Sequence, residues 1–128
     1  MTALEILKWV HLLAAAVWTG GLITLAALVA ALRRAGADRP MLQATARQFG
    51  RLSWSALAVA VATGIWQVIE LDWPWRHLEL KIALVALVAA LALGHQLTAR
   101  RTPAAMRGAL QALILVVSVA IFGAAVAL

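Results

Sequence analysis

Four long apolar segments make up most of this chain and constrain its fold more than any other feature. They span residues 4–32, 52–71, 80–99 and 109–128, and each is near or above the roughly 20 residues that an α-helix needs to cross a bilayer. Lipid offers no partners to peptide groups, so such segments must be helical. The sequence therefore predicts an all-α integral membrane protein, an antiparallel four-helix bundle that forms a single transmembrane domain over residues 1–128.

The composition agrees with this class and excludes several functions. Hydrophobic residues make up 65% of the 128 positions and charged residues only 12%, about half the charged fraction of a typical soluble domain. Cysteine is absent, so disulfides and thiolate metal sites are excluded. The methionines, Met1, Met41 and Met106, all lie outside the apolar segments. A Cu(I) pathway built from soft sulfur ligands is therefore excluded as well.

The basic residues indicate how the chain is oriented in the membrane. The net charge is +6, and eight arginines lie in the first and third connections, whereas the middle connection holds only Arg76. These eight are Arg33, Arg34, Arg39, Arg47, Arg51, Arg100, Arg101 and Arg107. Arginine-rich connections stay in the cytoplasm, so both termini are expected outside. We interpret the charge as a topology signal rather than a nucleic-acid site, and expect a multi-pass protein of the bacterial cytoplasmic (inner) membrane.

His11 is the first candidate functional residue, because an ionisable side chain within a membrane span costs free energy to insert and is functional by default. Ala14 and Ala15 follow one turn later, which leaves little bulk beside the imidazole, and Trp18 lies two turns away. His11 is a candidate ligand of a metal or haem iron. The alternative is a buried imidazole hydrogen-bonded to a neighbouring carbonyl group. Gly20, Gly21 and the pair Thr63-Gly64 are expected to permit close helix packing.

Further polar residues are expected in the same outer half of the membrane. His77 and Lys81 stand at the outer start of the third segment, and Lys8 precedes His11 by one turn. Each has an ordinary interpretation, as a loop residue for His77 and as snorkelling cations for the two lysines. His95 lies about 27 Å from His77 by helix rise, so we expect it to be an interfacial or interhelical polar residue without a cofactor role.

The chain resembles the copper-resistance D (CopD) domain family. The segment Lys8-Trp9-Val10-His11 followed by Trp18-Thr19-Gly20-Gly21 resembles the first helix of these domains, which begin with Lys-x-x-His and continue to Trp-x-Gly-Gly. Two segments resemble the start and end of the family's second helix, Phe49-Gly50-Arg51-Leu52-Ser53 and Thr63-Gly64. A third segment resembles its third helix, Leu80-Lys81-Ile82-Ala83-Leu84-Val85. The resemblance implies a small four-helix membrane protein with a role in copper handling or membrane redox chemistry.

The chain is also similar to HemJ-type protoporphyrinogen oxidases, four-helix membrane proteins with a first-helix histidine followed by a tryptophan. The segment Trp75-Arg76-His77-Leu78-Glu79-Leu80-Lys81 resembles part of their third helix. Because this family binds haem b through His and Lys, the resemblance implies ligand roles for His11 and Lys81, and enzymatic oxidation of a porphyrinogen as one activity. A quinone or a porphyrin would be the partner in the bilayer, and a homo-oligomer is a further candidate state.

Three functions therefore stay open. The chain could bind haem b or copper, with His11, His77, Lys81, Lys8 and Trp18 as the cofactor-binding residues and His11 and His77 as metal ligands. It could be a haem-dependent oxidoreductase, or it could be a membrane assembly module with no cofactor. Of the two cofactors, haem suits the small residues and cations around His11 better, since cations near the outer interface can pair with propionates.

The arginine distribution generates a topology prediction. Reporter fusions at Gly36 and at Pro74 are expected to report opposite compartments, with Gly36 in the cytoplasm, because the arginines concentrate on the Gly36 side. Paired alkaline phosphatase and green fluorescent protein fusions at each position would measure this. Activity of the same reporter at both positions would contradict the four-span topology.

Overall fold

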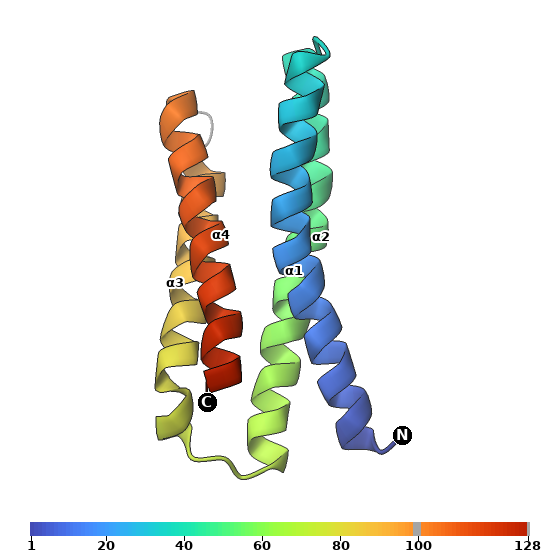
Figure 1. The fold of residues 1–128 in the computed structure, drawn as a ribbon, viewed down its shortest axis with the longest axis vertical. Coiled ribbons are helices and arrows are strands. Elements are labelled where there is room, and N and C mark those ends of the chain that lie inside the picture. The colour runs from blue at the N-terminus through green and yellow to red at the C-terminus, as the bar shows by residue number, and fades with distance from the viewer. Residues whose placement is uncertain (99–100, 128) are drawn as a thin grey trace. The chain divides into compact units, whose positions relative to one another are not determined.

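The computed structural model describes residues 1–98 and 101–127. Over these residues the chain forms four α-helices, α1 (Ala3–Arg34), α2 (Arg39–Glu70), α3 (Glu79–Thr98) and α4 (Ala104–Ala127), with a short 3-10 helix η1 (Trp75–Leu78) before α3 (Figure 1). Each of the four α-helices is long and apolar enough to cross a membrane. The predicted all-α, four-helix membrane architecture is thereby confirmed. Residues 99, 100 and 128, which end the third and fourth expected segments and include Arg100, lie outside the described residues.

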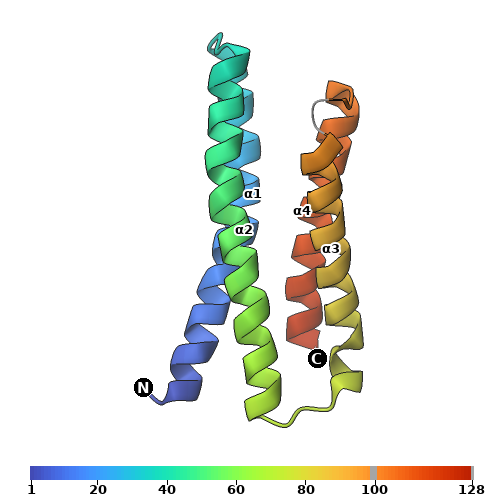
Figure 2. The same cartoon turned by 180° about the vertical axis from the view of Figure 1, so that it is seen from behind.

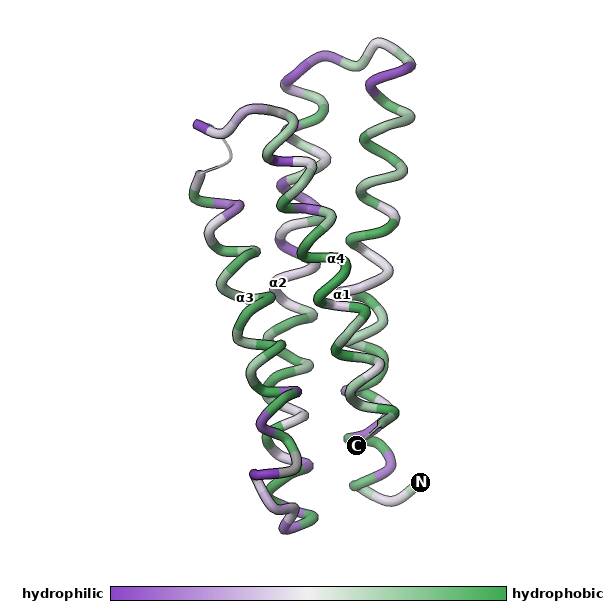
Figure 3. Tube along the Cα trace, turned by 60° about the vertical axis from the view of Figure 1, so that its left-hand side comes forward, coloured by the Kyte–Doolittle hydropathy of each residue, from purple (hydrophilic) through white to green (hydrophobic). Residues whose placement is uncertain are grey.

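The helices group into two compact units, residues Met1–Asp72 and Trp73–Leu128. In the first unit α1 packs antiparallel against α2, and in the second α3 packs against α4 and η1 (Figures 1 and 2). Within each helix the apolar residues form long runs, and hydrophilic residues gather mainly toward the ends of the hairpins (Figure 3). Each unit is therefore a helical hairpin with apolar flanks suited to lipid.

The start of α2 differs from the expectation for the first connection. Residues 33–51 were expected to form a polar loop before a span at residue 52, but α2 begins at Arg39. The chain turns at Gly36, whose φ of 83° suits a residue without a Cβ atom. The Asp38 side chain then accepts a hydrogen bond from the Met41 backbone N–H at 2.9 Å, which caps the new helix. Pro40 in the first turn costs no helical hydrogen bond.

Several arginines expected in connections therefore lie on helices. Arg39, Arg47 and Arg51 belong to α2, and Arg107 belongs to α4, which begins at Ala104 rather than at residue 109. Arginine, glutamine, alanine and methionine are all good helix formers, so a polar composition did not interrupt the helix. The expected starts of the second and fourth helices, at residues 52 and 109, were wrong because the end of the apolar run marks the limit of the span and not the limit of the helix.

The second unit has a small, well-packed centre. Val88 on α3 is fully buried, and Ile114 and Ser118 on α4 are 2% and 1% exposed. The Ser118 hydroxyl donates to the Ile114 carbonyl at 2.8 Å, one turn earlier in the same helix. A buried serine satisfied in this way lets two helices approach closely without leaving an unpaired hydroxyl group.

The Asp38 cap generates a stability prediction. Asp38→Ala removes the acceptor for the Met41 N–H and is expected to lower the free energy of unfolding by about 1 kcal/mol. Asp38→Asn keeps a capping oxygen and should stay close to the parent protein. Helicity followed by circular dichroism during a denaturing-detergent titration measures both variants. Equal losses in the two variants would show that the side-chain cap is unimportant.

Candidate functional site

Small side chains make up half of the buried residues at the seam between α1 and α2. Ala14, Trp18 and Leu22 are the buried residues of α1, and Ser53, Ala56, Leu57, Ala60 and Val68 are those of α2. These positions fall on one face of each helix, because an α-helix repeats every 3.6 residues. Small residues at such a seam let two helix backbones come close together, which is how helices commonly associate in lipid.

His11 lies on this face of α1 and makes a polar contact with α2. Its Nδ1 atom is 2.8 Å from the carbonyl oxygen of Ala60 and 3.1 Å from Oγ1 of Thr63. The Thr63 hydroxyl in turn donates to the Val59 carbonyl at 2.6 Å. The side chain of His11 is part-buried. The imidazole is thus held by α2 through two acceptors that lie three residues apart.

These contacts determine which nitrogen of the imidazole carries the proton. A carbonyl oxygen can only accept a hydrogen bond, so Nδ1 must be protonated at 2.8 Å from the Ala60 oxygen. The Thr63 hydroxyl lies 2.6 Å from the Val59 carbonyl and 3.2 Å from the Ala60 carbonyl, so it donates within α2 and its Oγ1 is a second acceptor for Nδ1–H. In the neutral ring the lone pair then lies on Nε2. A metal-binding histidine commonly has this arrangement, with one nitrogen donating to a carbonyl group and the other presented as the ligand.

Gly64 makes room for the His11 ring. A Cβ atom at position 64 would lie 3.1 Å from Cε1 of His11, closer than an ordinary van der Waals contact, and 3.5 Å from Nδ1 of the same ring. The predicted role of Gly64 in close helix packing is therefore confirmed, and its neighbour is His11. Gly21 makes a looser contact, with its Cβ position 3.5 Å from Oγ of Ser53, and Gly20 has no neighbour within 4 Å.

Trp18 packs within the same seam, two turns from His11. It is only 5% exposed, and its ring meets Trp54 edge-on, with centroids 6.2 Å apart and an interplanar angle of 67°. This geometry is a favourable aromatic pair. A role for Trp18 beside a cofactor stays a prediction, and the structure gives it a packing partner on α2.

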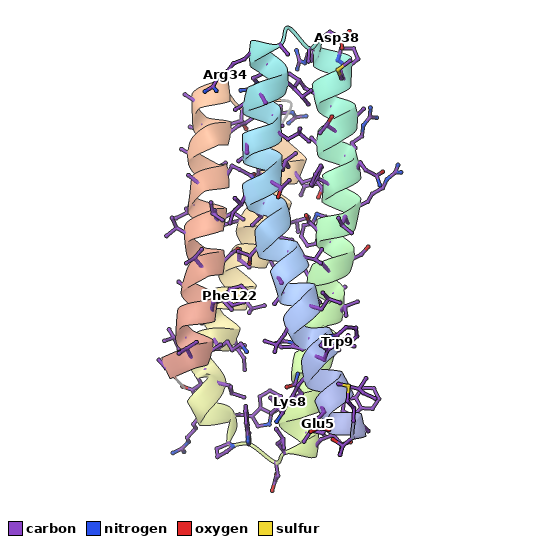
Figure 4. The ribbon with its side chains drawn as sticks, turned by 45° about the vertical axis from the view of Figure 1, so that its right-hand side comes forward. Glu5, Lys8, Trp9, Arg34, Asp38 and Phe122 are labelled. Atoms are coloured by element: carbon purple, nitrogen blue, oxygen red, sulfur yellow. The ribbon has the colours of Figure 1, made fainter. Side chains whose placement is uncertain are left out.

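The end of the first unit that holds the N-terminus carries further polar residues. Figure 4 shows Glu5, Lys8 and Trp9 at one end of the hairpin and Arg34 and Asp38 at the other. Glu5 closes a capping box with Thr2, whose backbone N–H donates to the Glu5 carboxylate at 2.6 Å. Lys8 is exposed, as snorkelling to an interface requires.

Two polar residues of α2 that stand near the same end bond within their own helix. The Trp66 indole N–H donates to the Glu70 carboxylate at 3.1 Å, and the Gln67 amide donates to the Thr63 carbonyl at 3.2 Å. Both contacts join residues four positions apart. Trp66 is 57% exposed. Its placement therefore suits a membrane interface, where an indole ring has an apolar body and a polar N–H.

The other predicted site residues belong to the second unit. Lys81 lies in the first turns of α3 with a half-buried side chain. The backbone of His77 lies in η1, but its side chain is outside the described part of the structure. His95 lies near the end of α3, and its Nδ1 is buried without a hydrogen-bond partner in the described chain. The predicted joint site of His11 with His77 or Lys81 therefore stays a prediction.

The described residues contain no group of three or more His, Asp or Glu side chains that could hold a metal ion. A bare copper ion usually needs several protein ligands. A porphyrin supplies four ligands to its own iron, so the protein needs to add only one or two axial ligands. Among the residues that the structure describes, the imidazole of His11 could therefore contribute one ligand nitrogen.

Comparison with protein families, with characterised proteins and with solved structures finds no match. The functional interpretation therefore depends on the residues of this chain and their contacts. Sequence reasoning identified His11 but missed the Ala60 carbonyl as its acceptor and Trp54 as the partner of Trp18. The small residues of α2 at positions 53, 56, 60 and 64 were the available signal, since their spacing marks the face that α1 would contact.

The contact between Gly64 and His11 generates a packing prediction. Gly64→Ala is expected to push the imidazole away and to destabilise the α1–α2 hairpin by about 1–3 kcal/mol. Gly20→Ala is the matched control, because it has open space and should be neutral or gain up to about 1 kcal/mol of helix propensity. Denaturing-detergent titration of both variants tests this. A Gly64→Ala protein as stable as Gly20→Ala would rule out the tight contact.

Proposed function

We propose that this chain is a multi-pass membrane protein that binds b-type haem through Nε2 of His11 and takes part in membrane redox chemistry. The observation that carries the proposal is the bond between Nδ1 of His11 and the Ala60 carbonyl at 2.8 Å. This bond supports the proposal in two ways. It assigns the lone pair to Nε2, and it fixes the ring so that little side-chain freedom is lost when a ligand binds.

The resemblance to CopD domains and HemJ-type oxidases points to the same residue. Both families have a histidine at the position of His11, and the second also implies Lys81 as a ligand. We propose that His77 or Lys81 would be the second residue to hold the haem group. Imidazole is neutral near pH 7, whereas an amine must lose a proton before it binds iron. Lys8 is proposed to pair with a propionate group, since it is exposed one turn from His11.

Bound haem would supply one-electron chemistry to the membrane. The residues of this chain would hold and orient it: His11 as ligand, and the Ala60 carbonyl and Thr63 hydroxyl as the groups that position the imidazole. Substrates of the porphyrinogen or quinone class fit a lipid-exposed redox site. Copper bound as Cu(II) by imidazole is the alternative cofactor for the same ligand.

A second candidate function, a cofactor-free membrane assembly module, is favoured by the same contact. Interhelical hydrogen bonds hold membrane helices together, at about 0.6–2 kcal/mol each. His11 bonds to Ala60 and Thr63 across the seam and packs on Gly64, which is sufficient to explain a histidine at this position as a structural clasp. The two candidates differ in whether Nε2 has a ligand role.

His11→Asn separates the two candidates. The Asn amide can replace Nδ1–H as a donor to the Ala60 carbonyl, but it does not replace Nε2 as an iron ligand. The haem proposal predicts loss of most of the Soret absorbance of protein purified in detergent, with little change in the denaturing-detergent midpoint. A structural clasp predicts no absorbance in the parent protein and a lower midpoint only in His11→Ala.

His95→Ala is the matched control for this experiment. It removes a histidine from a helix of the other unit and should keep the cofactor content of the parent protein. Single variants His77→Ala and Lys81→Ala would identify the second ligand by a shifted spectrum. Full haem content with an unchanged spectrum in His11→Asn and in His11→Ala would refute the proposed site.

A further inference from the structure

A stripe of exposed polar residues lines the first turns of α2. Arg39, Gln43, Arg47 and Arg51 recur at every fourth position, so they lie along one side of the helix, and all four are exposed. We call this set the arginine stripe. It spans about 18 Å of helix axis. Arg33 and Arg34 at the end of α1 are also exposed and add to the positive charge at this end of the hairpin, where Figure 4 labels Arg34.

The charge of this region is strongly one-sided. Residues 24–51 contain five arginines and a single acidic residue, Asp38. The carboxylate of Asp38 is occupied as the cap of α2, where it accepts from the Met41 N–H. The region therefore offers several guanidinium groups to an anion from outside the hairpin, and guanidinium groups match phosphate oxygens in a bidentate manner.

The register of the hairpin sets the depth of the stripe. His11 lies beside Gly64, and Gly21 lies beside Ser53. Leu52, the first residue of the apolar span of α2, is consequently level with about residue 22 or 23 of α1. Beyond that level α1 continues through residues 24–32, in which Thr24 is the only polar residue. An apolar stretch of α1 of about 14 Å thus runs beside the arginine stripe of α2.

The apolar part of α1 therefore extends further toward the turn than the apolar part of α2. A hairpin standing upright would either expose the apolar end of α1 to water or bury the arginines in hydrocarbon. Tilting resolves the mismatch, since it lays the apolar end of α1 into the membrane and keeps the stripe at the level of the lipid headgroups. The start of α2 would then resemble an interfacial helix, with its basic side toward the headgroups and the apolar end of α1 beside it in the membrane.

We propose that the arginine stripe is a binding site for the phosphate groups of anionic phospholipids, in the leaflet that faces the α1–α2 turn. The partner is argued from charge and depth: the headgroup layer supplies phosphates at the level where the stripe lies, and clusters of basic residues beside a membrane span attract anionic lipid. Each arginine contributes about a fivefold preference for anionic over zwitterionic lipid.

The test uses the full chain in nanodiscs made with equal parts of phosphatidylglycerol and phosphatidylcholine, with retained lipids counted by native mass spectrometry. The parent protein should retain phosphatidylglycerol in excess. The triple variant Arg39→Gln, Arg47→Gln, Arg51→Gln should lose most of that excess, and glutamine preserves the helix. The excess should also fall as salt is raised, because salt screens exposed charges.

Two controls make the result decisive. The double variant Arg47→Gln, Gln48→Arg keeps the composition and net charge but moves one cation about 100° around α2, so it should lose about the preference of one arginine. Inorganic phosphate added in millimolar amounts should not displace the lipid. Equal retention of both lipids by the parent protein, an unchanged preference in the triple variant, or displacement by free phosphate would each overturn the proposal.

Discussion

The absence of hydrogen-bonding partners in lipid is the constraint on which the rest of this structure depends. It forces the backbone of each span into a helix, and it also favours internal partners for polar side chains within a span. Thr63 donates to Val59 and Ser118 donates to Ile114, each to a carbonyl one turn back. His11 instead bonds to a carbonyl of the neighbouring helix, that of Ala60 on α2. The seam of the first hairpin is thereby organised around one side chain.

The number and type of the helices could be predicted from the sequence, because membrane spans are read directly from hydropathy and length. The start of α2 could not be read in that way. Hydropathy reports where lipid ends, whereas the helix continues through polar residues up to the turn at Gly36 and the cap at Asp38. Asp38 followed by Pro40 is a helix-start signal, and it carried more information about this boundary than the end of the apolar run.

The candidate site was predictable only in part, for a reason of geometry. His11 is conspicuous as an ionisable residue in an apolar segment, but its acceptor is a backbone carbonyl 49 residues away. Every residue has such a carbonyl, so composition gives no sign of which one is used. Only the register of α1 against α2 selects Ala60, and that register follows from where small residues such as Gly64 allow close approach.

The structural and the ligand roles of His11 need not compete. A histidine that binds a metal is normally held by a second hydrogen bond from its other nitrogen, and loss of such a bond commonly weakens metal binding by 10-fold to 100-fold. The bond that joins α1 to α2 is a bond of this kind. If Nε2 binds iron, the contact between the helices supports the ligand, and the hairpin supplies a preorganised imidazole. Gly64 makes this possible because it leaves room for the ring. If it binds nothing, the same bond remains a sufficient reason for the residue.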